Sequence, residues 1–256
     1  MRYWNRNLIS TTKHLPNAAQ TSGVYDLTSQ RLYKKRSLWP SSGMVNNNLI
    51  AYLDAAVTTS YSSGATTWSD LSGNGNHTPL TGTHSLDTDG GGSIDFASGA
   101  GGIVPIPLAD FSPNGGTIEA WCKITDTSGY RHIVGWRNSQ SFYLLLLSNN
   151  GKIEARDQAN GDIATTDIGA ATWANNWSQV VFTTEPGNQT AYYRNGQLVN
   201  NKARNSNGYS DTSGCIIAKG FGTPACKHSV FRAYDRPLTA SEVLQNYEFQ
   251  RARHGL

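Results

Sequence analysis

The sequence predicts an all-β fold, a sandwich or barrel of short antiparallel strands with an extended N-terminal arm and a short C-terminal helix. Composition is the first reason: the 256 residues include 26 Gly and 12 Tyr, and only 15% of the side chains are charged. Turn formers and strand formers outnumber helix formers, which favours short strands joined by turns. A chain of this length can build one large β domain with its own core, and two domains are not required.

The division of the chain rests on charge. Residues 1–43 hold seven basic side chains and one acidic side chain, a net charge of +6, whereas the remaining residues hold 14 basic and 17 acidic side chains, a net charge of −3. We therefore predict a basic extended arm over residues 1–43, with a hinge at 41–43, and a β domain over residues 44–256. We expect the arm to anchor the protein through its apolar and basic side chains, with a short helix that needs a surface to pack on. These anchoring residues are Tyr25, Leu27, Arg31, Leu32, Lys34, Lys35, Arg36, Leu38 and Trp39.

Strand-like segments separated by turn signals follow the arm. The clearest alternation lies in residues 117–124, where the even positions from Ile118 to Ile124 are apolar and the odd positions include Glu119 and Trp121. Asn195-Gly196 predicts a tight hairpin turn, and residues 148–151 predict another. Further strands are expected at residues 49–53, 93–96, 103–106, 132–136, 142–147, 152–157, 177–184, 190–194, 198–199, 215–218 and 228–234.

The C-terminus carries a helix signature. Thr239 and Glu242 have the spacing of a capping box, in which each side chain bonds the backbone N–H of the other residue. Leu238 and Val243 flank them at the positions of a hydrophobic staple. The sequence therefore predicts a short amphipathic helix from Thr239 to about Arg253.

Four stretches together resemble a known family. They are Trp68-x-Asp70-x-Ser72-Gly-Asn-Gly-Asn76, Thr117-Ile-Glu-Ala-Trp121, Trp177 with Tyr193-Arg-Asn-Gly-Gln-Leu-Val199, and Ala233-Tyr-Asp-Arg-Pro-Leu-Thr239. In this order they resemble the laminin-G-like domain of the concanavalin A-like jelly roll, over roughly residues 45–253, and more narrowly the versions found in bacteriophage virion proteins. The arm's Gly23-Val-Tyr-Asp-Leu and Leu38-Trp39-Pro40 are similar to a segment that recurs in tailed-phage structural proteins.

This resemblance implies a two-sheet antiparallel jelly-roll sandwich in a phage virion. We expect a non-enzymatic structural protein, a capsid decoration or a tail appendage, anchored by its arm with the jelly roll projecting. Its partners would be other virion proteins of the capsid or tail, and it would be a homo-oligomer or present in many copies. Such a protein is made in the host cytoplasm and released by lysis. The chain departs from the family at residues 97–102 and 226–231, where acidic residues of relatives are missing, so no calcium or other cofactor is expected.

The sequence offers little for catalysis. The same jelly roll hosts β-glucanases, whose retaining chemistry needs two carboxyl groups about 5 Å apart. Glu154 and Asp157 are three residues apart, which points them to opposite faces of a strand, and Glu119 has no acidic neighbour. Cys226 and His228 could share one strand face, but a metal needs further ligands. We therefore expect no catalytic residues and no metal site.

Exposed aromatic side chains are the basis of an alternative function. Sugars stack on such rings, so a carbohydrate-binding adhesin for host-surface glycans is the second hypothesis. Trp121 and Trp177 lie at family core positions, and plugging of core edges is the competing interpretation for the other rings. The aromatic residues that we expect near a glycan are Tyr61, Tyr130, Trp136, Trp173 and Tyr209.

Three further expectations concern the surroundings of the protein. Lys34-Lys35-Arg36 could touch DNA through phosphates, but a protein-bound face is favoured and nucleic acid is not an expected partner. No apolar run approaches the length that spans a bilayer, and the N-terminus has no secretory signal, so no membrane is expected. The odd number of cysteines, with Cys122 inside a strand pattern, favours folding in a reducing compartment, although Cys215 and Cys226 could pair.

Overall fold

The structure is a computed structural model of the chain. It describes residues 43–111, 114–125, 131–136, 142–147, 152–157, 161–166, 174–185, 187, 189–203, 212–219 and 225–256. Within these ranges the side chains of residues 131, 142–147, 152–157 and 161–166 are not described. The arm and its anchoring residues lie outside the described residues, so the division of the chain near residue 43 stays a prediction.

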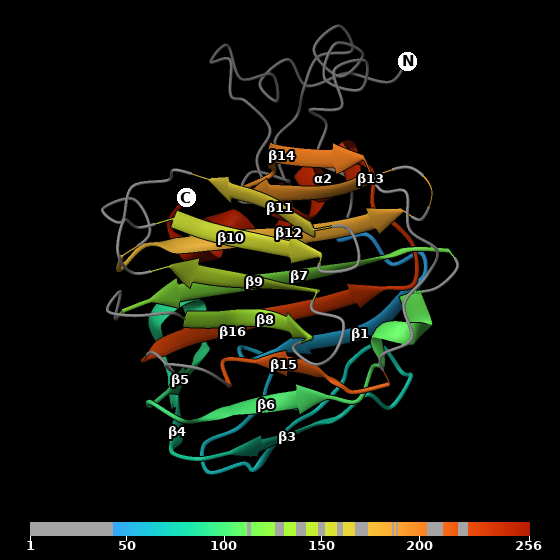
Figure 1. The fold of residues 1–256 in the computed structure, drawn as a ribbon. Coiled ribbons are helices and arrows are strands. Elements are labelled where there is room, and N and C mark those ends of the chain that lie inside the picture. The colour runs from blue at the N-terminus through green and yellow to red at the C-terminus, as the bar shows by residue number, and fades with distance from the viewer. Residues whose placement is uncertain are drawn as a thin grey trace, which may run out of the picture.

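Two stacked antiparallel sheets make up the described fold, each with eight strands in the described residues (Figure 1). The first sheet has the order β14-β13-β12-β7-β16-β5-β4, with β1 paired to β16, and the second has the order β11-β10-β9-β8-β15-β6-β3-β2. The strands of the first sheet are β1 (Leu49–Asp54), β4 (His84–Asp87), β5 (Ser93–Phe96), β7 (Gly116–Ile124), β12 (Trp177–Glu185), β13 (Gln189–Arg194), β14 (Gln197–Ala203) and β16 (Cys226–Tyr234). Those of the second are β2 (Thr67–Trp68), β3 (Thr78–Thr81), β6 (Gly101–Val104), β8 (Arg131–Trp136), β9 (Phe142–Leu147), β10 (Lys152–Asp157), β11 (Gly161–Thr166) and β15 (Cys215–Ile217). The predicted two-sheet antiparallel sandwich is confirmed.

Strand β7 shows how the sandwich is layered. Its even positions, Ile118 to Ile124, belong to the main hydrophobic core between the sheets. Glu119 and Trp121 point to the opposite face of the first sheet and are nevertheless buried. The reason is the C-terminal helix α2 (Ala240–Gln250), which covers that face: the rings of Trp121 and Tyr247 stack with centroids 5.8 Å apart.

Helix α2 begins as the sequence predicts. The Thr239 side chain accepts a hydrogen bond from the Glu242 N–H and the Glu242 side chain accepts one from the Thr239 N–H, which confirms the capping box. Leu238 and Val243 pack in a second hydrophobic cluster with residues of β12, β13 and β16. The α-helix ends at Gln250, and the 3-10 helix η6 (Arg251–His254) continues the chain almost to its end. Two further 3-10 helices are η3 (Asp89–Gly91) and η4 (Leu108–Phe111).

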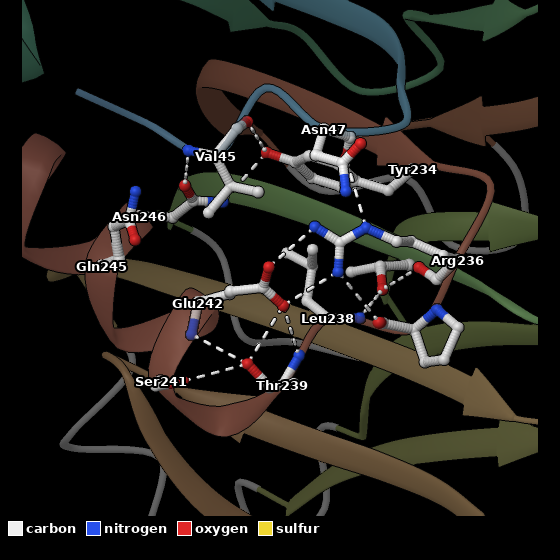
Figure 2. A network of polar contacts seen from close by, with 12 residues as sticks. Val45, Asn47, Tyr234, Arg236, Leu238, Thr239, Ser241, Glu242, Gln245 and Asn246 are labelled. Atoms are coloured by element: carbon white, nitrogen blue, oxygen red, sulfur yellow. Dashed lines mark hydrogen bonds and ion pairs between the residues drawn. The ribbon is translucent and has the colours of Figure 1, made fainter. Parts of the chain in front are cut away.

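A polar network joins α2 to the first sheet and to the segment that precedes β1. Glu119 lies at its centre: it accepts hydrogen bonds from Arg232 (2.8 Å), Gln179 (2.9 Å) and Asn246 (2.8 Å). Asn246 in turn accepts the Val45 N–H at 2.8 Å. Figure 2 shows the outer part of this arrangement: Tyr234 and Asn246 bind Val45, and Arg236 bridges the Asn47 carbonyl and Glu242. We call the part of this arrangement around Glu119 the C-terminal network. It consists of Val45, Glu119, Gln179, Arg232, Tyr234 and Asn246.

The hairpin predictions are confirmed, whereas four strands were missed. Asn195 and Gly196 have φ values of 48° and 74°, as the tight turn between β13 and β14 requires. Strands β9 and β10 pair antiparallel, with Leu147 opposite Lys152, which is the pairing expected for two strands of a hairpin. The missed strands β2, β3, β4 and β11 are short or contain Pro, Gly and Asp, so their order comes from pairing with neighbours rather than from local pattern.

The three cysteines are buried and form no disulfide bond. Cys122, Cys215 and Cys226 are buried and free, so the pairing of Cys215 with Cys226 that the sequence left open is not formed. Burial raises the pKa of the Cys122 thiol to about 12. In the part of the chain that the structure describes, no helix has the length and apolar character to cross a bilayer.

Candidate functional site

An open depression of about 500 Å³ lies where β1 begins and β16 ends. We call it the rim depression. Its wall comes from four parts of the chain: strand β1, the loop after β2, the segment from β6 through η4, and the residue after β16. Its lining residues are Ile50, Asn74, Asn76, Ile106, Ala109, Asp110 and Asp235.

The loop that contributes two of these residues is held rigid by Asp70. The carboxylate accepts hydrogen bonds from the backbone N–H groups of Tyr52 (2.9 Å), Ser72 (2.9 Å) and Asn76 (3.0 Å), and from the Ser72 hydroxyl (2.7 Å). Partial burial acts to raise the pKa of Asp70, but these hydrogen bonds outweigh it and hold the pKa below its usual value. The hydrogen bonds of Asp70 therefore join the loop after β2 to strand β1.

The two asparagines use their amide nitrogens to bind β1. Nδ2 of Asn74 donates to the Leu49 carbonyl at 3.0 Å and Nδ2 of Asn76 donates to the Ile50 carbonyl at 2.7 Å. The Ile50 carbonyl is available because the pairing of β1 with β16 shifts register between Leu49 and Ala51. Each amide nitrogen thus binds the backbone of β1, and the Oδ1 atom of each asparagine accepts no hydrogen bond from the described residues.

Two carboxylates complete the polar wall. Asp110 lies on η4, is exposed, and its carboxylate has no hydrogen-bond or ion-pair partner within the described part of the chain. Asp235 follows β16 and is fixed by its backbone N–H, which donates to the Asn48 carbonyl at 3.1 Å. Oδ1 of Asp235 is buried and has no partner among the described residues. The rim depression is therefore an open concavity in which acceptor oxygens lie beside a few apolar side chains.

The structure shows two of the five aromatic residues predicted near a glycan, and both are buried. Tyr61 is 2% exposed and Trp136 is fully buried, so neither ring can stack on a sugar, and the expectation of exposure was wrong for both. Trp136 instead packs edge-on against Phe111 and donates Nε1 to the Ile106 carbonyl at 2.8 Å, which fixes the floor of the rim depression from below. The other three, Tyr130, Trp173 and Tyr209, lie outside the described residues.

The acidic residues considered as possible hydrolase catalysts are either buried or on strands whose side chains are not described. Glu119 is fully buried in the C-terminal network, paired with Arg232. Glu154 and Asp157 both lie on strand β10, whose side chains are not described. A serine–histidine pair that the sequence did not reveal, Ser229 Oγ and His254 Nε2 at 2.6 Å, lies buried under α2.

Two buried histidines of the domain have lowered pKa values. Burial lowers the pKa of His228 to about 3, and its ring nitrogens have no partner in the described residues. Burial also lowers the pKa of His254 to about 3. The pair of Cys226 and His228 lies in the interior, and within the described ranges no group of three or more His, Cys, Asp or Glu could hold a metal ion.

The comparisons with known proteins agree with the fold. Residues 98–244 match the family model described as the concanavalin A-like lectin/glucanases superfamily, laminin-G type. The chain belongs to this superfamily. The comparison with curated proteins found no match.

Several solved structures with low sequence identity are similar to the chain in fold alone. A mutant of Trypanosoma rangeli sialidase displaying trans-sialidase activity is similar with a TM-score of 0.61 and 15% identity, over 88% of this chain and 38% of that chain. The binding domain of botulinum neurotoxin DC in complex with SialylT is similar with a TM-score of 0.62 and 16% identity, over 79% of this chain and 51% of that one. The binding domain of botulinum neurotoxin serotype D has a TM-score of 0.63 and 16% identity, over 80% and 53%. The chain therefore spans between a third and about half of the length of these proteins.

Sequence reasoning missed the rim depression, although part of the signal was present. Two of the four family-like stretches meet there: the first contributes Asn74 and Asn76, and the last contributes Asp235. The loop that holds Asn74 and Asn76 is irregular, with φ values of 88° at Gly73 and 77° at Gly75. Asp110 carries no signal in its own surroundings, because only the tertiary fold brings η4 beside the asparagine loop.

Proposed function

We propose that this protein is a carbohydrate-binding protein, that it binds without catalysis, and that the rim depression is its glycan site. One observation carries the proposal: four side chains with unused oxygen atoms surround an apolar floor in an open concavity of about 500 Å³. Carboxylate and amide oxygens accept hydrogen bonds from sugar hydroxyls, and the partly exposed Ile50 and Ala109 offer apolar surface for the C–H face of a sugar ring.

The comparisons support this class of ligand. The chain belongs to a superfamily described by its lectins and glucanases, and the similar solved structures include a sialidase and a toxin domain in complex with SialylT. Fold likeness does not transfer a ligand, so the residues of this chain must supply the specificity.

The steric variant Ala109→Trp tests the site. Ala109 is partly exposed on η4 and lines the depression, so an indole at this position fills the concavity without entering the core. The matched control is Ala252→Trp, an exposed alanine on the other 3-10 helix η6. On a glycan array, the full chain and Ala252→Trp should bind the same glycans and Ala109→Trp should lose them. Equal binding by all three proteins would place any glycan site elsewhere, and an array with no signal for the full chain would refute the proposed function.

Virion placement is a separate proposal that rests on the sequence. The basic arm and the phage-like stretches support a virion protein that displays this domain on a capsid or tail. Deleting residues 1–43 should leave a folded domain with unchanged glycan binding that no longer joins the particle. Incorporation of the truncated protein at full stoichiometry would contradict the anchoring role of the arm.

A further inference from the structure

The polar wall of the rim depression presents mainly hydrogen-bond acceptors among its described side chains. Nδ2 of Asn74 donates to the carbonyls of Leu49 and Ile50, and Nδ2 of Asn76 donates one of its two N–H groups to the Ile50 carbonyl, while the Oδ1 atoms of both residues remain as acceptors. Ionised Asp110 and Asp235 can only accept hydrogen bonds. All four polar side chains therefore offer the same kind of partner to a ligand.

The backbone of the wall adds no donor at the polar positions. The N–H of Asn74 donates to Ser72 Oγ and that of Asn76 to Asp70 Oδ2. The N–H groups of Asp110 and Asp235 donate to the carbonyls of Pro107 and Asn48. The Ile106 N–H likewise donates to the Val104 carbonyl. A ligand that needs donors from the protein finds none among these groups.

The charge of the wall has the same sign throughout. Asp110 and Asp235 contribute two negative charges, and none of the described lining residues is basic. Arg236, the next residue along the chain from Asp235, is turned to α2, where it pairs with Glu242 at 2.7 Å and 2.9 Å. Arg236 also interacts electrostatically with Asp235, but its guanidinium is bound by Glu242, so the carboxylates of Asp110 and Asp235 still favour a cationic ligand over an anionic one.

We propose that the rim depression selects sugars with a free amino group, a hexosamine, over the N-acetylated and the sialylated equivalents. This inference rests on the proposed carbohydrate-binding function and names its ligand class. An ammonium group donates three hydrogen bonds and carries a positive charge, which matches acceptors and carboxylates together. The hydroxyls of the same sugar donate to the Oδ1 atoms of Asn74 and Asn76, which accept no hydrogen bond from the described residues. Acetylation removes the charge, and a sialic acid brings a carboxylate that the wall repels.

The test compares three oligosaccharides of equal length by calorimetric titration of the full chain: one of glucosamine, one of N-acetylglucosamine and one ending in sialic acid. At about pH 6, below the ordinary pKa of an aliphatic amine, the glucosamine probe should bind about 5-fold more tightly than the acetylated probe, as expected for exposed ion pairs. The sialylated probe should bind more weakly than both. The preference should shrink as salt is added, because exposed charges are screened.

The variant Asp110→Asn with Asp235→Asn isolates the cause. It keeps four acceptor oxygens and removes both charges, so the affinities for glucosamine and N-acetylglucosamine should become equal. Equal affinities in the unaltered protein, a tighter sialylated probe, or a preference that requires added calcium would overturn this inference while leaving glycan binding intact. Failure of every glycan on the array, with no effect of Ala109→Trp, would instead refute the proposed function itself.

Discussion

Two polar clusters, the C-terminal network and the rim depression, meet at the end of β16. They differ in whether their carboxylates are hydrogen-bonded within the protein. In the C-terminal network the carboxylate of Glu119 is fully buried and accepts hydrogen bonds from three side chains. In the rim depression the carboxylate of Asp110 is exposed and has no partner in the described structure. Tyr234 belongs to the network and the next residue, Asp235, to the depression, so a single step along the chain separates the two.

The difference indicates what each cluster is for. Buried polar groups cost free energy unless they are paired, so a saturated network fixes one arrangement of helix and sheet. An exposed group without a partner contributes little to the fold and stays available to a ligand. We therefore expect substitutions in the network to lower stability and substitutions in the depression to change binding.

The largest expected effect is on the network. Glu119→Gln keeps the shape of the side chain but leaves the fully buried Arg232 without its counter-charge. The free energy of unfolding should fall by about 3–5 kcal/mol, measured by urea denaturation at neutral pH. Adding Arg232→Met to this variant should recover much of the loss, because the uncompensated charge is then gone. A loss below about 1 kcal/mol would mean that the buried pair of Glu119 and Arg232 contributes little to stability.

An intermediate loss of stability is expected at acidic pH. It distinguishes the two clusters because His254 lies near Arg232 of the C-terminal network, whereas the described lining of the depression contains no histidine. Burial lowers the pKa of folded His254 to about 3, against an ordinary value of 6.5. Above about pH 6.5, His254 is neutral in both the folded and the unfolded state. Below about pH 6.5, the histidine is protonated in the unfolded state but stays neutral in the folded state. Stability is therefore full above about pH 6.5 and falls toward about pH 3, by up to about 1.4 kcal/mol per pH unit for this histidine.

The variant His254→Phe checks this assignment. Phenylalanine keeps a ring against Trp121, whose centroid lies 4.0 Å from that of His254. Denaturation at about pH 7, 6 and 5 should show a shallower decline in the variant than in the parent, with His228 accounting for part of what remains. Parallel curves would show that His254 takes no part in the acid sensitivity.

The fold was largely predictable because its signals are local. The alternation of residues 117–124, the Asn195-Gly196 turn and the Thr239–Glu242 capping box each specify a conformation within a few residues, and all three are present. Strands such as β3, with Pro79 at its second position, have no such signal and depend on their partners. The burial of Tyr61 and Trp136 also depends on partners, which explains why loop proximity was a poor guide to exposure.

The candidate site was not predictable for a related reason. Asn74 and Asn76 look like turn residues because their amide nitrogens do serve the turn, and only the structure reveals that their oxygens remain unused. Asp110 and Asp235 are separated by more than a hundred residues and carry no shared motif. Their proximity follows from the end of β16 lying beside the segment after β6, a property of topology rather than of sequence pattern.

The smallest expected effect on stability belongs to the depression, where Asp110→Asn sharpens the comparison. Because the carboxylate is exposed and unpaired in the described structure, the free energy of unfolding should change by no more than about 0.5 kcal/mol in urea denaturation. The affinity for an amino sugar should fall in the same protein. A carboxylate that contributes to the fold would show the reverse, a stability loss with unchanged binding. Asp110 and Glu119 thus give opposite expectations from the same chemical change, and measuring both variants in both assays decides whether the two clusters divide folding from recognition.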